Sequence, residues 1–317
     1  MSRTNERQRV PEDGSREVTM VPRARPASYY GRAVLKPPVW QEDIAYYFFL
    51  GGLSAGASLL AAGADQSGRT ALRRGGRLGA LGSLGLGTFF LVKDLGRPER
   101  FHHMLRVAKL TSPMSVGTWI LSAYGAACAT AAAAEVWPAP RTRGRPARVL
   151  AVAGRPAGLV AALLAPAVAA YTAVLIADTA VPAWNAARRE LPFVFTASAA
   201  ASAGGLGMIV APPDEAAPAR RLAQYGAIVE LAASRRLEAR RELALEPYRS
   251  GEAGRLLNRA SALTAAGVLG SMLAGRRSRL AAVCSGAALL AGGVYERLGI
   301  FRAGVASTTD PRYVNGG

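Results

Sequence analysis

Histidine and cysteine are scarce in this chain of 317 residues, which has only two of each. A membrane cytochrome b needs paired histidines at membrane depth for each haem, and an iron–sulfur cluster needs about four cysteine thiolates. His102 and His103 are neighbours in a polar segment, whereas Cys128 and Cys284 stand alone in separate apolar stretches. We therefore expect no haem, no iron–sulfur cluster and no disulfide framework in this chain.

Charge is almost absent from several long stretches of the sequence. The chain is 50% hydrophobic, and the runs 44–64, 78–92 and 159–177 are nearly uncharged. Repeated runs of this length predict membrane spans. The 39 Lys and Arg residues outnumber the 21 Asp and Glu residues, and they gather in the connections between the apolar runs. We interpret them as charges that contact lipid headgroups and set topology, and we expect no nucleic-acid partner.

The apolar pattern predicts an all-α integral membrane protein with a bundle of about eight transmembrane helices. The predicted helices cover about 43–63, 76–94, 115–136, 157–178, 191–210, 222–233, 256–275 and 280–298. The sixth is short and contains Glu230, so it either crosses the membrane or lies flat, which would leave about seven spans. We expect it to continue as a charged amphipathic helix to about Glu246. Residues 1–42 are predicted to be a basic, disordered tail, 43–301 the helical domain, and 302–317 a C-terminal tail.

Two further features predict how the helices are arranged. Gly52 and Gly56 lie one turn apart on the first helix, so another helix can approach closely there. Each span reverses the side of the membrane on which the chain emerges. The start of the first helix, the 93–115 connection and the end of the fourth helix should therefore share one side, which we call the first face.

Several segments resemble the NrfD/PsrC family of membrane subunits. The most distinctive are Leu91-Val-Lys-Asp-Leu-Gly-Arg-Pro-Glu-Arg-Phe101 and Thr111-Ser-Pro-Met-Ser-Val-Gly-Thr-Trp119. Further similarity lies in Tyr46–Gly52, in Tyr171–Leu175 with Val181–Trp184, in Leu191–Phe195 with Ser198, and in Glu296–Arg302 with Asp310–Tyr313. The resemblance covers about residues 35–314.

The resemblance implies a function in electron transfer. Members of this family are quinone-reactive membrane subunits of molybdoenzyme-type oxidoreductases. It therefore implies a bound quinone, either menaquinone or ubiquinone, and two partners: a ferredoxin-like 4Fe–4S subunit and a molybdopterin-type catalytic subunit. The expected location is the cell membrane, with multiple spans.

A quinone site needs polar groups for the head-group oxygens and a proton acceptor that leads to water. Tyr171 lies about 10 Å before Asp178 along one helix, on nearly the same face. We predict Tyr171 and Tyr47 as quinone-binding residues, the alternative for Tyr171 being aromatic packing. Asp178, Asp43 and His102 are the predicted proton-handling residues. Each of these three residues also has a structural interpretation. Asp178 could be an interfacial carboxylate that pairs with nearby arginines, and Asp43 could stabilise the positive N-terminal end of its helix. His102 could be an inert surface residue.

The turn that contains Asp94, Arg97 and Glu99 is predicted to dock the iron–sulfur partner. Gly96 and Pro98 end the preceding helix abruptly there, and Arg97 is expected to pair with Asp94 or Glu99. Glu230 is left with two interpretations, a structural ion pair or part of a proton path. Two other functions stay open at this point: a secondary transporter, and a membrane anchor without quinone chemistry.

Overall fold

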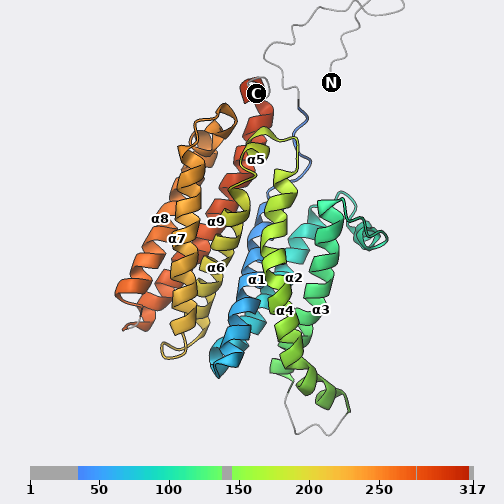
Figure 1. The fold of residues 1–317 in the computed structure, drawn as a ribbon, viewed down its shortest axis with the longest axis vertical. Coiled ribbons are helices and arrows are strands. Elements are labelled where there is room, and N and C mark those ends of the chain that lie inside the picture. Colours follow the sequence, from blue (N-terminus) through green and yellow to red (C-terminus); the bar gives the residue numbers. More distant parts are fainter. Residues whose placement is uncertain (1–34, 138–144, 276, 314–317) are drawn as a thin grey trace, which may run out of the picture. The chain divides into compact units, whose positions relative to one another are not determined.

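The computed structural model describes residues 35–137, 145–275 and 277–313. Most of the predicted tail at 1–42 therefore lies outside the described residues. Within them, eight helices of 20 residues or more account for most of the chain, as predicted (Figure 1). They are α1 (Asp43–Gln66), α2 (Thr70–Lys93), α3 (Pro113–Val136), α4 (Arg145–Ala177), α6 (Leu191–Val210), α7 (Ala217–Ala239), α8 (Gly251–Leu273) and α9 (Arg279–Thr309). The shorter elements are η1 (Pro98–Leu105), α5 (Pro182–Ala186), η2 (Leu243–Tyr248) and η3 (Pro311–Tyr313).

The helices form two groups of four. One group contains α1 to α4 and the other α6 to α9, and α1 joins them by packing against α6 and α9. In the apolar window of α1, 89% of the residues are buried, compared with 67% in α6 and 28% in α3. Since a bundle buries its central helices on all sides, α1 and α6 form its centre. Glycines permit this contact, because a Cβ atom at Gly56 would lie 2.6 Å from the Cβ of Ala203, which confirms the predicted close approach.

Among the described residues, five helices are long and apolar enough to cross a membrane, namely α1, α2, α3, residues 148–177 of α4, and α6. The chain is therefore a multi-pass membrane protein. Helices α7, α8 and α9 fall outside that group but run alongside the other helices (Figure 1). Helix α7 corresponds to the sixth predicted helix, and it packs lengthwise against α6 instead of lying flat across the bundle.

Two helices begin earlier in the structure than the sequence predicts. Helix α2 begins at Thr70, not at Gly76, because the Glu215 carboxylate accepts hydrogen bonds from the backbone N–H groups of Ala71 and Leu72, at 2.8 and 3.1 Å. Helix α4 begins at Arg145, twelve residues before the predicted start at residue 157.

The C-terminal half contains two further differences. Helix α7 ends at Ala239, so the expected continuation to Glu246 is wrong. Arg240 adopts an extended backbone there, and its guanidinium binds Glu190 and Glu242, which turns the chain into η2. Helix α9 continues to Thr309 and includes the first residues of the predicted C-terminal tail.

Candidate functional site

Three segments that are distant in the sequence meet on the first face. The backbone N–H of Gln41, just before α1, donates a hydrogen bond of 2.8 Å to Oδ1 of Asp94, which ends α2. Lys93 Nζ lies 3.0 Å from Oδ2 of Asp43. The end of α4 lies beside them, because one hollow is lined by Thr179, just after α4, by Met114 and by residues that precede α1. The prediction that these three segments share one face is therefore confirmed.

This hollow has a volume of about 400 Å³ and is mainly apolar. We call it the mouth hollow; its main lining residues are Trp40, Met114, Thr179, Val181 and Trp184. The rings of Trp40 and Trp184 lie 6.0 Å apart, and the indole N–H of Trp184 donates a 2.8 Å hydrogen bond to the Ile300 carbonyl. Trp184 is completely buried, so the hollow has a rigid aromatic wall. Its size and its apolar lining suit a flat organic head group.

Carboxyl groups gather beside the mouth hollow. Asp43 and Glu42 line an adjoining hollow of about 850 Å³, which shares Trp40 with the first. Partial burial raises the pKa of Asp94 above its ordinary value. The hydrogen bond from the Gln41 N–H opposes this rise, and the negative charge of Asp43 adds to it. A carboxyl group shifted in this direction accepts a proton more readily near neutral pH.

Tyr171 and Asp178 do not line the mouth hollow. The Tyr171 ring is half-buried and packs against α3, where a Cβ atom at Gly117 would lie 2.5 Å from it. Asp178 is exposed just beyond the end of α4, and within the described residues it forms no ion pair, neither with Arg188 nor with Arg189. Their predicted roles in quinone chemistry stay predictions. Sequence reasoning missed Trp40 and Met114 as hollow-lining residues, although an aromatic residue before an apolar helix is a recognisable interfacial signal.

The remaining predicted residues are spread over the first face and α1. Tyr47 is buried in α1 beside Phe48 and does not reach the mouth hollow. His102 is exposed in η1, with its ring 4.4 Å from that of His103.

Arg97 and Glu99 are exposed at the start of η1, and no ion pair among the described residues involves either. The expected pairing of Arg97 with Asp94 or Glu99 is therefore wrong. The Asp94 carboxylate binds the Gln41 backbone instead. Asp94 thus fastens the turn to α1, and the Arg97 and Glu99 side chains point to solvent.

Apolar side chains are exposed along the same connection. Phe101 is 51% exposed, Val107 66% and Leu110 90%. Phe101 lies in η1 with its ring centre 6.0 Å from that of His102, and Val107 and Leu110 lie between η1 and α3. Several exposed apolar side chains on a polar connection are typical of a protein–protein contact surface.

A family model described as "Polysulphide reductase, NrfD" matches residues 33–213, which is more than half of the chain. The chain belongs to the NrfD family. It also resembles the C subunit of polysulfide reductase from Wolinella succinogenes, with 37% identity over 92 residues. That match covers 27% of this chain and 29% of the relative.

The NrfD match contains the residues that line the mouth hollow except Thr308 of α9. It begins just before Trp40 and ends between α6 and α7, so α1 to α6 lie inside it. The segments around η1 and α5, which line or flank the mouth hollow, are included. Helices α7, α8 and α9 lie outside the matched residues.

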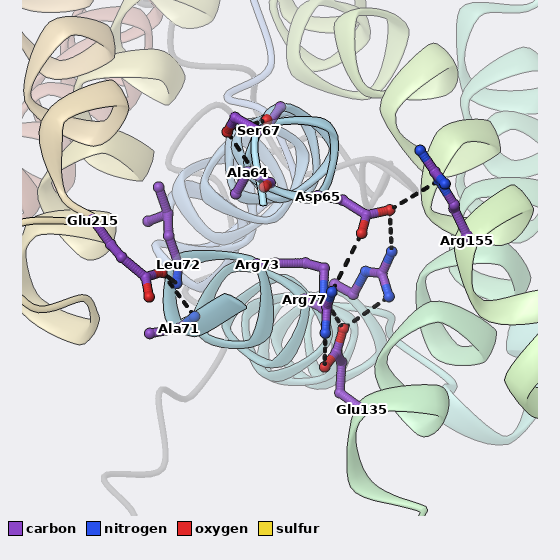
Figure 2. Close-up of polar contacts among 11 residues, drawn as sticks. Ala64, Asp65, Ser67, Ala71, Leu72, Arg73, Arg77, Glu135, Arg155 and Glu215 are labelled. Carbon is purple, nitrogen blue, oxygen red and sulfur yellow. Dashed lines mark hydrogen bonds and ion pairs between the residues drawn. The ribbon is translucent and has the colours of Figure 1, made fainter. Parts of the chain in front are cut away.

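The opposite side of the NrfD-matched bundle contains an ion cluster (Figure 2). Arg73 and Arg77 of α2 each bind both Asp65 at the end of α1 and Glu135 at the end of α3, and Arg155 of α4 reaches Asp65. Arg77 and Glu135 are buried, at 8% and 7% exposure. The cluster thus ties four helices together far from the mouth. Each carboxylate is paired, so we assign the cluster to structural stability.

No cluster that could hold a metal occurs in the described part of the chain, where no three His, Cys, Asp or Glu side chains come together. Cys128 is buried on α3, and Cys284 is exposed on α9.

Proposed function

We propose that this chain is the membrane subunit of an oxidoreductase complex and exchanges electrons between a quinone of the membrane, menaquinone or ubiquinone, and an iron–sulfur partner. That partner is a ferredoxin-like 4Fe–4S subunit, which connects the chain to a molybdopterin-type catalytic subunit at the cell membrane. The similarity to a polysulfide reductase subunit supports the assignment to a reductase complex. The observation that carries the proposal is the apolar mouth hollow, which is lined by Met114 at the start of α3, just after the exposed connection that contains η1.

The mouth hollow fits a quinone head group by size and lining. Ligand pockets usually have volumes of about 300–1,000 Å³ and apolar walls with few polar groups. The half-buried Trp40 offers a flat surface to a ring, the buried Trp184 supports it from behind, and Met114 offers an adaptable apolar side chain. The isoprenoid tail would remain in the lipid beside α3 and α4.

Charged residues near the hollow supply the proton chemistry. Oxidation of a quinol breaks two O–H bonds, passes two electrons to the iron–sulfur partner and releases two protons; reduction reverses each transfer. Asp43 and Asp94 are carboxyl groups at the aqueous edge, and Lys93 holds Asp43 in place at 3.0 Å. The raised pKa of Asp94 suits a group that accepts and releases protons.

Filling the mouth hollow tests the quinone part of the proposal. Met114→Trp places a large ring in the hollow, and we expect the purified complex to lose bound quinone and quinol turnover while it remains assembled. Met272→Trp is the matched control, because Met114 is 45% exposed and Met272, on α8, is 46% exposed. Unchanged quinone content in the Met114 variant would contradict the site. Loss of assembly in that variant alone would favour an anchor without quinone chemistry.

The docking part needs a separate experiment. A photoreactive amino acid at Leu110, which is 90% exposed, should crosslink to the iron–sulfur subunit in the assembled complex. The control position is Leu280, which is 73% exposed at the opposite end of the bundle. Crosslinks from Leu280 and none from Leu110 would place the partner on the wrong face for this proposal.

A further inference from the structure

Three charged side chains lie deep among helices α6 to α9. Glu230 of α7 is 3% exposed, and Glu296 and Arg297 of α9 are each 2% exposed. Glu230 is nine residues before the end of α7 at Ala239, which corresponds to roughly 13 Å of helix. Ionisable side chains at this depth are costly and are normally kept for a function.

Arg297 binds only one of the two carboxyl groups directly. Its guanidinium donates hydrogen bonds to Oε2 of Glu296 and, at 2.9 Å, to the Phe195 carbonyl of α6. The same guanidinium stacks on the Phe195 ring, with its central carbon 3.8 Å from the ring centre. Glu230 instead accepts a 3.0 Å hydrogen bond from the hydroxyl of Thr264 on α8. Arg297 is therefore committed to Glu296 and α6, and Glu230 has a neutral partner.

The charges of this group do not balance if every member is ionised. Two carboxylates and one guanidinium give a net charge of −1, and arginine does not lose its proton in proteins. An uncompensated charge buried away from water costs far more than protonation of a carboxyl group. One proton shared between Glu230 and Glu296 makes the group neutral. Both glutamates interact electrostatically with Arg297 and with each other, so the proton belongs to the pair.

Unused polar atoms and a small cavity adjoin the pair. Ser198 of α6 lies beside both carboxyl groups and interacts with each of them. Among the described residues, neither its hydroxyl nor Oε1 of Glu296 has a hydrogen bond of normal geometry. A cavity of about 20 Å³ touches both glutamates. A single water needs about 10–15 Å³ and polar neighbours, so the cavity can hold one.

The lining of this cavity leads toward the first face. Beyond the two glutamates it includes Ser234 and Glu238, one and two turns further along α7, and Ser261 of α8. Glu238 is half-buried near the end of α7, beside the charged residues Arg235 and Arg249. Hydroxyl and carboxyl groups thus continue from the buried pair to the aqueous edge, and hydroxyl groups can both donate and accept protons.

We propose that Glu230 and Glu296 form a proton-exchange site within the membrane, which holds one shared proton and exchanges it with the first face through Ser234, Ser261 and Glu238. This inference is independent of the mouth hollow, since the pair lies on helices outside the NrfD match and needs no quinone. It adds a proton-binding function in α6 to α9 to the electron-transfer function proposed for α1 to α5.

Infrared spectroscopy of the purified full-length protein tests the shared proton. A protonated carboxyl group has a C=O stretching band distinct from the bands of a carboxylate. We expect one such buried band at neutral pH, shifted after transfer to D2O. Glu230→Gln and Glu296→Gln should each abolish it, because either change leaves one carboxylate to balance Arg297. Both substitutions preserve side-chain shape, and size-exclusion profiles check that the variants fold.

Glu190→Gln is the matched control, because Glu190 is also buried, at 5% exposure, but is paired with Arg240 at 2.7 Å. It should leave the band unchanged. Ser261→Val fills the cavity and should slow the deuterium shift of the band without removing it. The proposal is overturned if wild type has no protonated carboxyl band, or if the band survives in either single glutamine variant. A deuterium shift that Ser261→Val leaves at the wild-type rate refutes the path.

Discussion

The contact between α1 and α6 joins the two halves of the bundle, and glycine-to-alanine substitutions measure it directly. A Cβ atom added at Gly56 would lie 2.6 Å from the Ala203 Cβ and 2.7 Å from the Ala199 carbonyl oxygen. At Gly52 the nearest atom would be 3.2 Å away, and at Gly51 nothing lies within 4 Å. These three glycines on one helix therefore form a graded series of increasing crowding.

The expected magnitudes follow from two opposing terms. Alanine stabilises a helix interior by about 0.5–1 kcal/mol relative to glycine. Overpacking of a well-packed contact costs about 1–3 kcal/mol. We expect Gly51→Ala to stabilise the protein by the first term alone, and Gly52→Ala to be nearly neutral. Gly56→Ala should destabilise it by about 1–2 kcal/mol, since backbone atoms of α6 cannot move aside.

Equilibrium unfolding in mixed detergent micelles, followed by circular dichroism, measures the series. The order of stability should be Gly51→Ala, then Gly52→Ala, then Gly56→Ala, and the total difference should be about 2–3 kcal/mol. If Gly56→Ala is as stable as Gly51→Ala, α1 and α6 do not approach as closely as described, and the reasoning about the centre of the bundle is refuted.

Three other predictions concern separate parts of the molecule. Tyr171→Phe should slow quinol turnover without loss of assembly, and Asp178→Asn should alter the pH dependence of turnover; wild-type rates across pH for both variants would remove these residues from the mechanism. The isolated subunit should show neither stoichiometric Soret absorption nor stoichiometric iron, and either would contradict the expected absence of haem and clusters. Arg77→Gln should lower the free energy of unfolding by about 3 kcal/mol or more, because it weakens the pairing of the buried Glu135. Arg155→Gln should lower it by less than about 1 kcal/mol, because Arg155 is 68% exposed. Equal effects would refute the assignment of the ion cluster to stability.

The sequence predicts the helices and the segments that share the first face, because both follow from the positions of the apolar runs. Long apolar runs fix the number of helices, and the alternation of sides places the start of α1 with the end of α4. The pair Gly52 and Gly56 identifies the contact face of α1 because small residues one turn apart have a direct geometric consequence. The family motifs around η1 add the expected partner.

The remaining features depend on residues that are far apart along the chain. Glu215, which caps α2, is 144 residues from Ala71, so the start of α2 has no local signal. The arginines in the first turns of α2 are typical of a connection between helices, so the sequence predicts no helix there. In the structure Arg73 and Arg77 pair with Asp65 and Glu135. The charge imbalance of Glu230 and Glu296 similarly emerges only when α7 and α9 are brought together in the bundle.

Photolabelling tests the central claim, a quinone site on the first face, most directly. The assembled complex is treated with an azido-quinone in membranes, illuminated and digested, and the labelled peptides are identified by mass spectrometry. Labels should fall on the segment around Trp40, on Met114 at the start of α3, and on residues 179–184, and excess unlabelled quinone should suppress them. Suppressible labels confined to the opposite end of the bundle, near Arg77 and Glu135, would contradict the account.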